Sequence, residues 1–177
     1  MKILYQGSPG AYSHLAALEV YPDAEILPCK TFDECFDRAQ QDDKLKIIIP
    51  ESNKTTGNIG IEYLIFKYRL NIYAEHFHKI EHNLLGLSGA KISNIKNVLS
   101  HAQGLSQCSN FIKKNNLNEN IRADTAGSAE LIAQNRIISD AAIASKLSAK
   151  IYKLDVLASN IENEKGNTTR FLIMGKE

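Results

Sequence analysis

Short apolar runs alternate with amphipathic segments along the chain, and this pattern predicts strands and helices in turn. The apolar runs have the length of strands, whereas the amphipathic segments repeat apolar residues three and four positions apart. The order of strand, helix, strand, helix, strand is typical of an α/β sheet. The expected strands are residues 2–5, 26–27, 45–49, 72–77, 80–87, 98–99, 140–144, 155–158 and 167–174. The expected helices are residues 13–19, 31–40, 61–68, 105–112, 125–133 and 145–152.

Two long extended segments follow each other within residues 71–87. Such a pair could carry the chain from one lobe into another. We therefore expect one domain, residues 1–177, made of two lobes. The first lobe would take residues 1–75 and 158–177, and the second would take residues 76–157.

The final strand has a polar beginning and an apolar end. Strand alternation should direct Thr169 to one face and Arg170 to the other, and residues 171–174 suit a strand that is covered on both faces. A hydroxyl and a guanidinium would then stand at the edge of a buried sheet, where α/β proteins usually bind ligands. An ordinary last strand with a wet edge would show the same pattern. Upstream, Pro50 is expected to stop the strand of residues 45–49.

The composition is that of an ordinary globular protein, with 44% hydrophobic and 23% charged residues among 177. The formal net charge of +1 gives no electrostatic reason to expect nucleic acid or an anionic membrane as a partner. No apolar run approaches the roughly 20 residues that span a bilayer, and the N-terminus lacks the pattern of a secretion signal. Three scattered cysteines argue against a disulfide framework, so we expect a cytoplasmic protein.

The histidines suggest a metal site, but the pattern does not complete one. His76 and His78 alternate on an expected strand and would share a face, with His82 following. Zinc needs a third and usually a fourth ligand, and no CxxC or HExxH pattern supplies them. We therefore predict no metal ligand. The GxGxxG and Walker signatures of nucleotide sites and the GxSxG elbow of serine nucleophiles are also missing.

Polar loops that end strands or begin helices carry the remaining chemistry. They supply hydroxyls, amides and one arginine, but few carboxylates, which suits recognition of a small anionic molecule by hydrogen bonds. A glycine turn that feeds a helix N-terminus also offers free backbone N–H groups to an anion. These loops are residues 7–13, 50–57, 100–107, 124–128 and 167–170.

These loops, taken in order, resemble the signature stretches of the prephenate dehydratase family. The resemblance covers essentially the whole chain in register, and five ordered motifs are far more specific than any one of them. Residues 7–13 resemble the opening glycine-tyrosine-serine motif, residues 100–108 the serine-histidine-proline-glutamine stretch, residues 124–129 the threonine-alanine loop, residues 141–145 the alanine-rich strand and residues 167–171 the threonine-arginine-phenylalanine hallmark.

The resemblance implies a two-lobed α/β fold like that of the type II periplasmic binding proteins, with the active site in the cleft between the lobes. It implies a carbon–oxygen lyase that converts prephenate to phenylpyruvate in phenylalanine biosynthesis, losing carbon dioxide and water together. No metal or organic cofactor would be required. Family members often pair, so a homodimer is expected by analogy.

The family motifs assign roles to particular residues. Thr169 would donate a hydrogen bond or a proton to the departing ring hydroxyl. Arg170 would pair with a substrate carboxylate or brace its loop. Gln107 and Asn53 would orient the ring and its leaving group.

Two helix beginnings, at Ser13 and Thr125, would hold the pyruvyl end of the substrate through backbone N–H groups and hydroxyls. Either Thr125 or Asp124 can cap the second of these helices. The threonine-alanine loop suits prephenate or its transaminated form, arogenate, because the sequence does not show whether the pocket meets a ketone or an ammonium. The other expected substrate-binding residues are Tyr12, Ser100, His101, Ala126, Ser128 and Asn167.

The loop at residues 50–57 departs from the family pattern. Ser52 stands where the family has glutamate, and Lys54 stands where it has a hydroxyl, while Asn53 is retained and Glu51 is displaced by one residue. A one-residue slip of the loop would restore the carboxylate. Without it, the chain could be a weaker enzyme, an enzyme for another substrate or a non-catalytic module that binds a small carboxylate.

Many family members carry a regulatory ACT domain after the catalytic part, where phenylalanine binds. The present sequence ends at residue 177, just past the last expected strand. We therefore expect no feedback inhibition by phenylalanine through such a domain.

Overall fold

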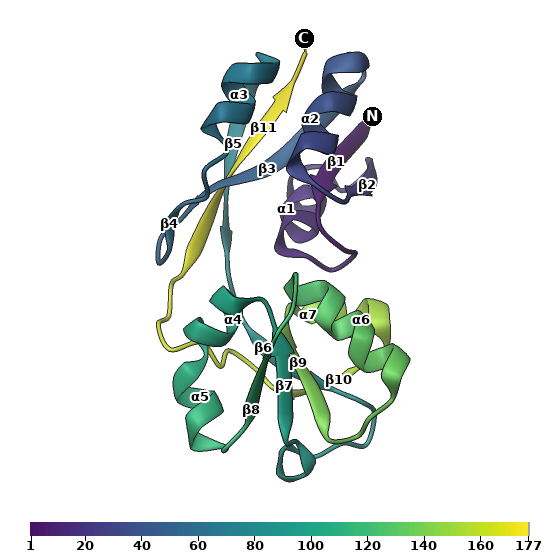
Figure 1. The fold of residues 1–177 in the computed structure, drawn as a ribbon. Helices are drawn as coiled ribbons and strands as arrows, with labels where there is room; N and C mark the ends of the chain where they lie inside the picture. The colour runs from purple at the N-terminus through teal and green to yellow at the C-terminus, as the bar shows by residue number, and fades with distance from the viewer. Residues whose placement is uncertain (177) are drawn as a thin grey trace. The chain divides into compact units, whose positions relative to one another are not determined.

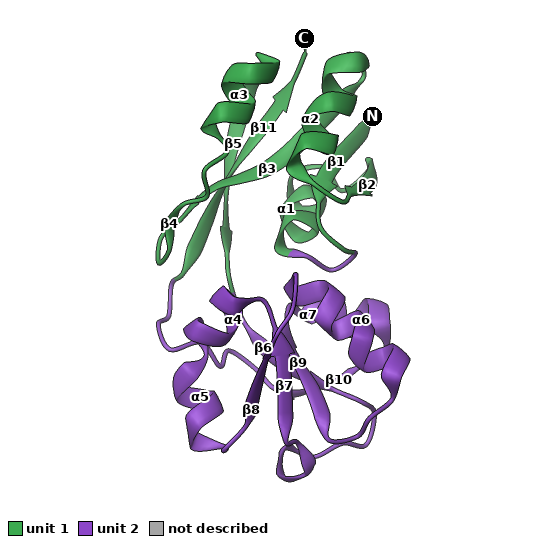
Figure 2. Ribbon diagram, in the orientation of Figure 1, with its two compact units in different colours: residues 1–8, 12–80, 167–177 green, residues 9–11, 81–166 purple. Residues whose placement is uncertain are grey.

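The computed structural model describes residues 1–176, which form two compact units (Figures 1 and 2). Unit 1 comprises residues 1–8, residues 12–80 and the chain from residue 167 onward, and unit 2 comprises residues 9–11 and 81–166. None of the described helices is long and apolar enough to cross a membrane.

Unit 1 contains one mixed sheet, in which the C-terminal strand adds antiparallel pairing. Its elements are β1 (Lys2–Gln6), α1 (Tyr12–Val20), β2 (Glu25–Cys29), α2 (Phe32–Gln41), β3 (Leu45–Asn53), β4 (Gly57–Asn58), α3 (Glu62–Tyr68), β5 (Asn71–Lys79) and β11 (Thr168–Gly175). The strand order is β2-β1-β3-β11-β5, and the short β4 pairs with the end of β3. Strand β1 pairs in parallel with β2 and β3. Strand β11, yellow in Figure 1, runs antiparallel to both of its neighbours.

Helices α2 and α3 cover one face of this sheet, and α1 packs on the other. On the first face, Ile47 of β3 and Leu172 of β11 belong to one buried cluster with Phe36 of α2. Each such apolar side chain contributes roughly 1.5–3 kcal/mol when it is fully buried. The apolar end of β11 is buried throughout because strands flank it on both sides and helices lie on both faces.

Unit 2 is built on a second sheet with the strand order β10-β6-β9-β7-β8. Strand β9 lies at its centre, and its four residues after Asp140 are apolar and buried. In chain order the elements of unit 2 are β6 (Asn83–Gly86), the 3₁₀ helix Ile92–Asn94, β7 (Asn97–Ser100), α4 (Ala102–Gln107), α5 (Ser109–Lys114), β8 (Asn118–Ile121), α6 (Thr125–Asn135), β9 (Asp140–Ala144), α7 (Lys146–Tyr152) and β10 (Asp155–Ala158).

Pro50 does not end its strand, contrary to the sequence prediction. Strand β3 continues to Asn53, although its parallel pairing with β1 ends at Ile48. A β-bulge follows, in which Phe171 lies opposite Pro50 and Arg170 lies opposite Ser52, so that residue 51 is the extra one. Proline cannot donate to a strand ladder, and it is tolerated where one side of the strand has no partner or where a bulge interrupts pairing.

The helix expected at residues 105–112 is divided into α4 and α5, with the break at the fully buried Cys108. The backbone of Cys108 leaves the helical region, at φ −114° and ψ 15°. The apolar spacing across the break is still helical, which is why the sequence pattern indicated one helix rather than two.

The sequence pattern placed the lobe boundaries after residues 75 and 157. In the structure, the chain passes from one unit to the other later than this. Strand β5 stays in unit 1 to its end because it pairs with β11, and β10 stays in unit 2 because it pairs with β6. The changes therefore fall after residues 80 and 166. Residues 9–11 also group with unit 2, where the Gly10 carbonyl accepts a hydrogen bond from Ser145 Oγ at 2.6 Å.

Candidate functional site

Asn53 and Thr169 are cross-strand partners on β3 and β11 of unit 1. Asn53 Nδ2 donates to Thr169 Oγ1 at 2.8 Å, while Asn53 Oδ1 accepts the backbone N–H groups of Thr55 at 2.9 Å and Thr56 at 3.2 Å. Backbone N–H groups only donate, so these two bonds fix which end of the Asn53 amide faces Thr169. One lone pair of the Thr169 hydroxyl is therefore occupied, and its proton is directed to a different acceptor.

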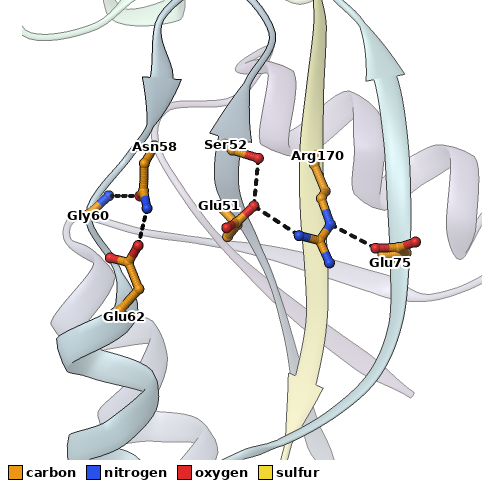
Figure 3. Close-up of polar contacts among 7 residues, drawn as sticks. All are labelled: Glu51, Ser52, Asn58, Gly60, Glu62, Glu75 and Arg170. Carbon is orange, nitrogen blue, oxygen red and sulfur yellow. Dashed lines mark hydrogen bonds and ion pairs between the residues drawn. The ribbon is translucent and has the colours of Figure 1, made fainter.

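Arg170 follows Thr169 on β11, so strand alternation directs its side chain to the opposite face of the sheet. Figure 3 shows its guanidinium between two carboxylates. Its Nε donates to Glu75 Oε2 at 2.7 Å, and its Nη1 lies 3.3 Å from Glu51 Oε2. The hydrogen bond to Glu75 is the main cause that raises the pKa of Arg170, so the guanidinium stays charged. Arg170 thus braces β3, β11 and β5 against one another.

The β-bulge decides where the displaced carboxylate lies. Because Glu51 is the extra residue of the bulge, its side chain lies beside Ser52, whose Oγ donates to Glu51 Oε2 at 2.6 Å (Figure 3). Ser52 occupies the position where the family motif has glutamate. The Glu51 carboxylate therefore lies next to that position, hydrogen-bonded to the Ser52 hydroxyl. The same oxygen receives Arg170 from β11.

Lys54 is exposed in the turn between β3 and β4, and its backbone N–H donates to the Thr168 carbonyl at 2.9 Å. The other end of this hairpin is tied to the start of α3. Asn58 bonds Glu62 and also accepts the Gly60 N–H at 2.7 Å (Figure 3). The hairpin is therefore held by backbone and amide groups, while the Lys54 ammonium stands outside it.

Asn167 precedes β11 and is 4% exposed. Its backbone carbonyl accepts the Ile80 N–H at 2.9 Å, but its side-chain Oδ1 has no hydrogen-bond partner among the described residues. A buried carbonyl oxygen without a donor is unfavourable by about 1–3 kcal/mol. This predicted substrate-binding residue therefore offers an unused acceptor.

Helix α1 begins beside the face of the sheet that carries Thr169. Ser13, in its first turn, is buried, and the ring of Tyr12 lies 6.1 Å from the ring of His78 between centroids. His78 is the cross-strand partner of Thr169 on β5. Directly paired residues point to the same face of a sheet, so His78 and Thr169 share one surface with the start of α1.

Glu19 lies near the end of α1 and contacts two histidines of β5. Its Oε2 is 2.8 Å from His76 Nε2 and 2.9 Å from His78 Nδ1. Partial burial opposes ionisation of Glu19, but the hydrogen bonds from both histidines outweigh it and lower its pKa. The carboxylate is therefore charged at neutral pH.

In unit 2, Ser100 at the end of β7 and Thr125 at the start of α6 both lie close to Gly104 in α4. A Cβ atom on Gly104 would lie 2.8 Å from Ser100 Oγ and 3.6 Å from Thr125 Cγ2. Only glycine permits this close approach. Ser100 is fully buried, and its hydroxyl donates to the Ile143 carbonyl at 2.7 Å.

His101 and Gln107 stand at the two ends of α4. His101 is the N-cap, and its Nδ1 accepts the Gln103 N–H at 3.3 Å. Gln107 Oε1 lies 2.7 Å from Nε2 of His82. His82 is 2% exposed, and this burial lowers its pKa, so the ring is neutral at pH 7 and donates from Nε2 to Gln107.

Asp124 rather than Thr125 caps α6, because Asp124 Oδ1 accepts the Gly127 N–H at 2.6 Å. Ala126 and Ser128 are fully buried in the first turns of this helix. Ser128 Oγ donates to the Asp124 carbonyl at 2.7 Å. Both side chains therefore pack the helix start.

The structure brings together some of the predicted residues within each unit: Asn53 with Thr169 in unit 1, and Ser100 with Thr125 in unit 2. The motifs gave no role to Glu19, His78 or His82. His78 pairs with Thr169, His82 contacts Gln107, and Glu19 contacts His78. The pairing of His78 with Thr169 depends on strand register, which the chain pattern did not reveal. Glu19 lies 57 residues before His76 in the sequence, so local spacing carries no signal for that contact.

A family model for prephenate dehydratase matches residues 3–177. A relative from Arabidopsis thaliana, "Arogenate dehydratase/prephenate dehydratase 1, chloroplastic", is 39% identical over 178 residues, which cover 100% of this chain and 45% of the relative. The chain therefore spans about half the length of the curated relatives that it matches.

Solved structures agree on the fold. A protein described as "GqqA- a novel type of quorum quenching acylases" superimposes with a TM-score of 0.92 at 32% identity, over 100% of this chain and 64% of that one. For the prephenate dehydratase from Staphylococcus aureus the TM-score is 0.85 at 26% identity, over 100% and 67% of the two chains.

A nutrient-binding protein from Burkholderia cenocepacia bound to methionine aligns with a TM-score of 0.51 at 8% identity, over 99% of this chain and 84% of that one, which shows likeness of fold alone. The predicted α/β fold class like that of periplasmic binding proteins is confirmed. The similar structures carry different activities in their names, so the fold does not by itself choose the reaction.

Proposed function

Because the chain belongs to the prephenate dehydratase family, we propose that it is a carbon–oxygen lyase that converts prephenate to phenylpyruvate in phenylalanine biosynthesis. The bond between the ring and its carboxylate breaks and releases carbon dioxide. The electron pair of that bond enters the ring, which becomes aromatic as the ring hydroxyl leaves as hydroxide. A proton from the solvent then converts the hydroxide to water. The protein has to hold the substrate and stabilise the departing oxygen.

The observation that carries this proposal is the orientation of the Thr169 hydroxyl. Asn53 donates to Thr169 Oγ1 at 2.8 Å and is itself fixed by two backbone N–H groups. The Thr169 proton is thereby left for an external acceptor, which in the proposed reaction is the leaving ring oxygen. A preorganised donor aimed at developing negative charge is worth most in a site with little water, and Thr169 is 7% exposed.

Arg170 takes a supporting part in this proposal. Its guanidinium is already bonded to Glu51 and Glu75 on the face opposite Thr169. We propose that it fixes β11 beside β3 and β5, so that Thr169 is held in place. Pairing of Arg170 with a substrate carboxylate, the other predicted role, would require it to leave two carboxylates.

Incubation of the purified chain with prephenate at neutral pH, with phenylpyruvate followed by its absorbance in alkali, tests the proposal. Turnover should clearly exceed the spontaneous decomposition of prephenate, and Thr169→Ala should abolish the excess. Thr169→Ser should retain part of it, because serine keeps the hydroxyl. The matched control is Thr168→Ala, which removes a hydroxyl from the adjacent residue on the other face and should leave turnover close to that of the wild type.

Arogenate is the second candidate substrate, because a 39% identical relative is named for both arogenate and prephenate. The same assay on arogenate compares kcat/KM for the two compounds. Turnover of neither substrate would refute both enzymatic proposals. The chain would then be a module that binds a small carboxylate, and Ser52 and Lys54 would be the residues that separate it from active relatives.

We further propose that the chain forms a homodimer in the cytoplasm. Strand β5 is the outer strand of the unit 1 sheet and exposes apolar side chains, with Ile72 53% and Phe77 59% exposed. The proposed cytoplasmic location is supported by the cysteines. All three are buried and form no disulfide, which fits a reducing compartment. Fractionation of cells that express a tagged chain tests the location, and recovery with the membrane or organelle fraction would contradict it.

A further inference from the structure

Three metal-ligating side chains converge in unit 1 around one small volume. Glu19 comes from α1, and His76 and His78 come from β5. Each can offer one ligand atom, and these atoms all lie within 4.8 Å of one another. The third ligand, which the local sequence pattern did not show, is supplied by α1, and three strands and two helices separate α1 from β5 in the chain.

The arrangement follows from strand geometry. Residues two apart on a strand point to the same face, so His76 and His78 present their rings side by side, with centroids 6.4 Å apart. Helix α1 packs on that face and places Glu19 against both rings. His78 is only 10% exposed at its side chain, His76 is 26% exposed and Glu19 is 47% exposed. The cluster is therefore rooted in the sheet and open to solvent on one side, where an ion can enter.

We propose that Glu19, His76 and His78 form a binding site for a divalent transition-metal ion of the zinc class. Imidazole nitrogens and a carboxylate oxygen are among the ligands that Zn²⁺ prefers, and two histidines with one glutamate plus water fill a tetrahedral shell. The proposed ligand atoms are His76 Nε2, His78 Nδ1 and one carboxylate oxygen of Glu19. This site does not depend on the proposed dehydratase reaction, and neither the family model nor the relatives' names mention a metal.

The separations of the three ligand atoms are in the range from which side-chain rotation can form a zinc shell. The Glu19 oxygen lies 2.8 Å and 2.9 Å from the two ring nitrogens. Zinc bonds of about 2.0–2.2 Å in a tetrahedron separate neighbouring ligand atoms by about 3.3 Å. Side-chain rotation would have to move the Glu19 oxygen a few tenths of an ångström away from each ring nitrogen and bring the two ring nitrogens, which lie within 4.8 Å of each other, to the same spacing. The competing account is that Glu19 simply accepts an N–H hydrogen bond from each imidazole, with no ion.

Direct binding of zinc to the intact chain distinguishes these accounts. The protein is stripped with a chelator, dialysed and titrated with Zn²⁺ against a chromophoric zinc indicator. The expected result is one zinc per chain. Loss of a residue that only hydrogen-bonds a zinc ligand lowers zinc affinity about 10–100-fold. Glu19→Gln, His76→Gln and His78→Gln each remove a ligand, so each should lower zinc affinity by at least that factor. His101→Asn is the matched control, since it removes a histidine of unit 2 but keeps a side-chain acceptor for the α4 cap, and its zinc affinity should equal that of the wild type.

Two further measurements distinguish the loss of a zinc ligand from misfolding of a variant. Circular dichroism should give cooperative melting for every variant, and Zn²⁺ should raise the Tm of the wild type and of His101→Asn but not of the three ligand variants. Co²⁺ in place of Zn²⁺ should give the intense visible absorption of a tetrahedral site in the wild type, and His78→Gln should abolish it. No saturable zinc binding, or binding that all three ligand variants retain, would overturn the proposal and leave a hydrogen-bonded cluster only.

Discussion

Asn53 sets the direction in which the Thr169 hydroxyl can donate, so its replacement tests positioning separately from chemistry. Asn53→Ala removes a hydrogen bond worth about 1 kcal/mol. We therefore expect kcat for the substrate that the enzyme converts to fall roughly fivefold, with a smaller change in KM. Asn53→Asp should fall further, because a carboxylate accepts the Thr169 proton instead of donating to its oxygen. Steady-state kinetics of both variants provide the measurement. Equal activities for the alanine and aspartate variants would rule out this role of Asn53.

His82 should make the stability of the protein depend on pH. Burial lowers its pKa in the folded state below the ordinary value of about 6.5, so the unfolded chain binds the proton first as the pH falls. The stabilisation is fully present above pH 6.5 and is lost as the pH drops from there through the lowered folded value, by up to about 1.4 kcal/mol per pH unit.

Urea denaturation of the wild type and His82→Gln at pH 7.5, 6.5 and 5.5 measures this effect. Glutamine keeps a side-chain donor for Gln107, and the lowered pKa of His14 is present in both proteins and cancels in the difference. The free energy of unfolding should fall less steeply in the variant. Parallel curves for the two proteins would show that His82 is not the titrating group.

Among the elements, the glycine turn at residues 9–11 is the most sensitive to a single added carbon. Gly10 has φ +96°, and a Cβ there would lie 2.5 Å from Ser148 Oγ on α7. We expect Gly10→Ala to lower the free energy of unfolding by about 2 kcal/mol, through both strain and the clash with α7. Gly60→Ala is the control, because Gly60 also has a positive φ, +85°, but open space around it. Chemical denaturation should show a smaller loss for Gly60→Ala, and equal losses would exclude a contribution from the clash.

The elements that the sequence predicted well are those whose signals are local. Strand β9, expected at residues 140–144, has those bounds. Thr169 and Arg170 alternate along β11 as expected, so that Thr169 bonds Asn53 on one face and Arg170 pairs with Glu51 on the other. The continuation of β3 past Pro50 was missed because it depends on a bulge against β11, more than a hundred residues away. From sequence alone, a proline predicts the end of a strand, and only the pairing with the partner strand shows that the strand continues.

At the scale of the whole molecule, contacts between distant segments account for what the sequence could not predict about the candidate site. The motifs pointed to Asn53 and Thr169 separately, but their hydrogen bond exists only because β11 inserts between β3 and β5. The convergence of Glu19 with His76 and His78 has the same origin. Residue type and spacing reveal which groups carry chemistry, and strand order decides which of them meet.

The same strand order leaves β5 as an outer strand, and no strand among residues 1–176 pairs with its outer edge. An exposed edge with apolar side chains favours pairing with a second copy, which would extend the sheet across a twofold axis. We expect the wild type to be a dimer by light scattering coupled to size exclusion, and Phe77→Lys to shift it towards the monomer, because a buried unpaired charge opposes association. Phe66→Lys is the control, since Phe66 is 79% exposed but lies on α3. A monomeric wild type at all concentrations, or a dimer that Phe77→Lys leaves intact, would exclude β5 as the interface.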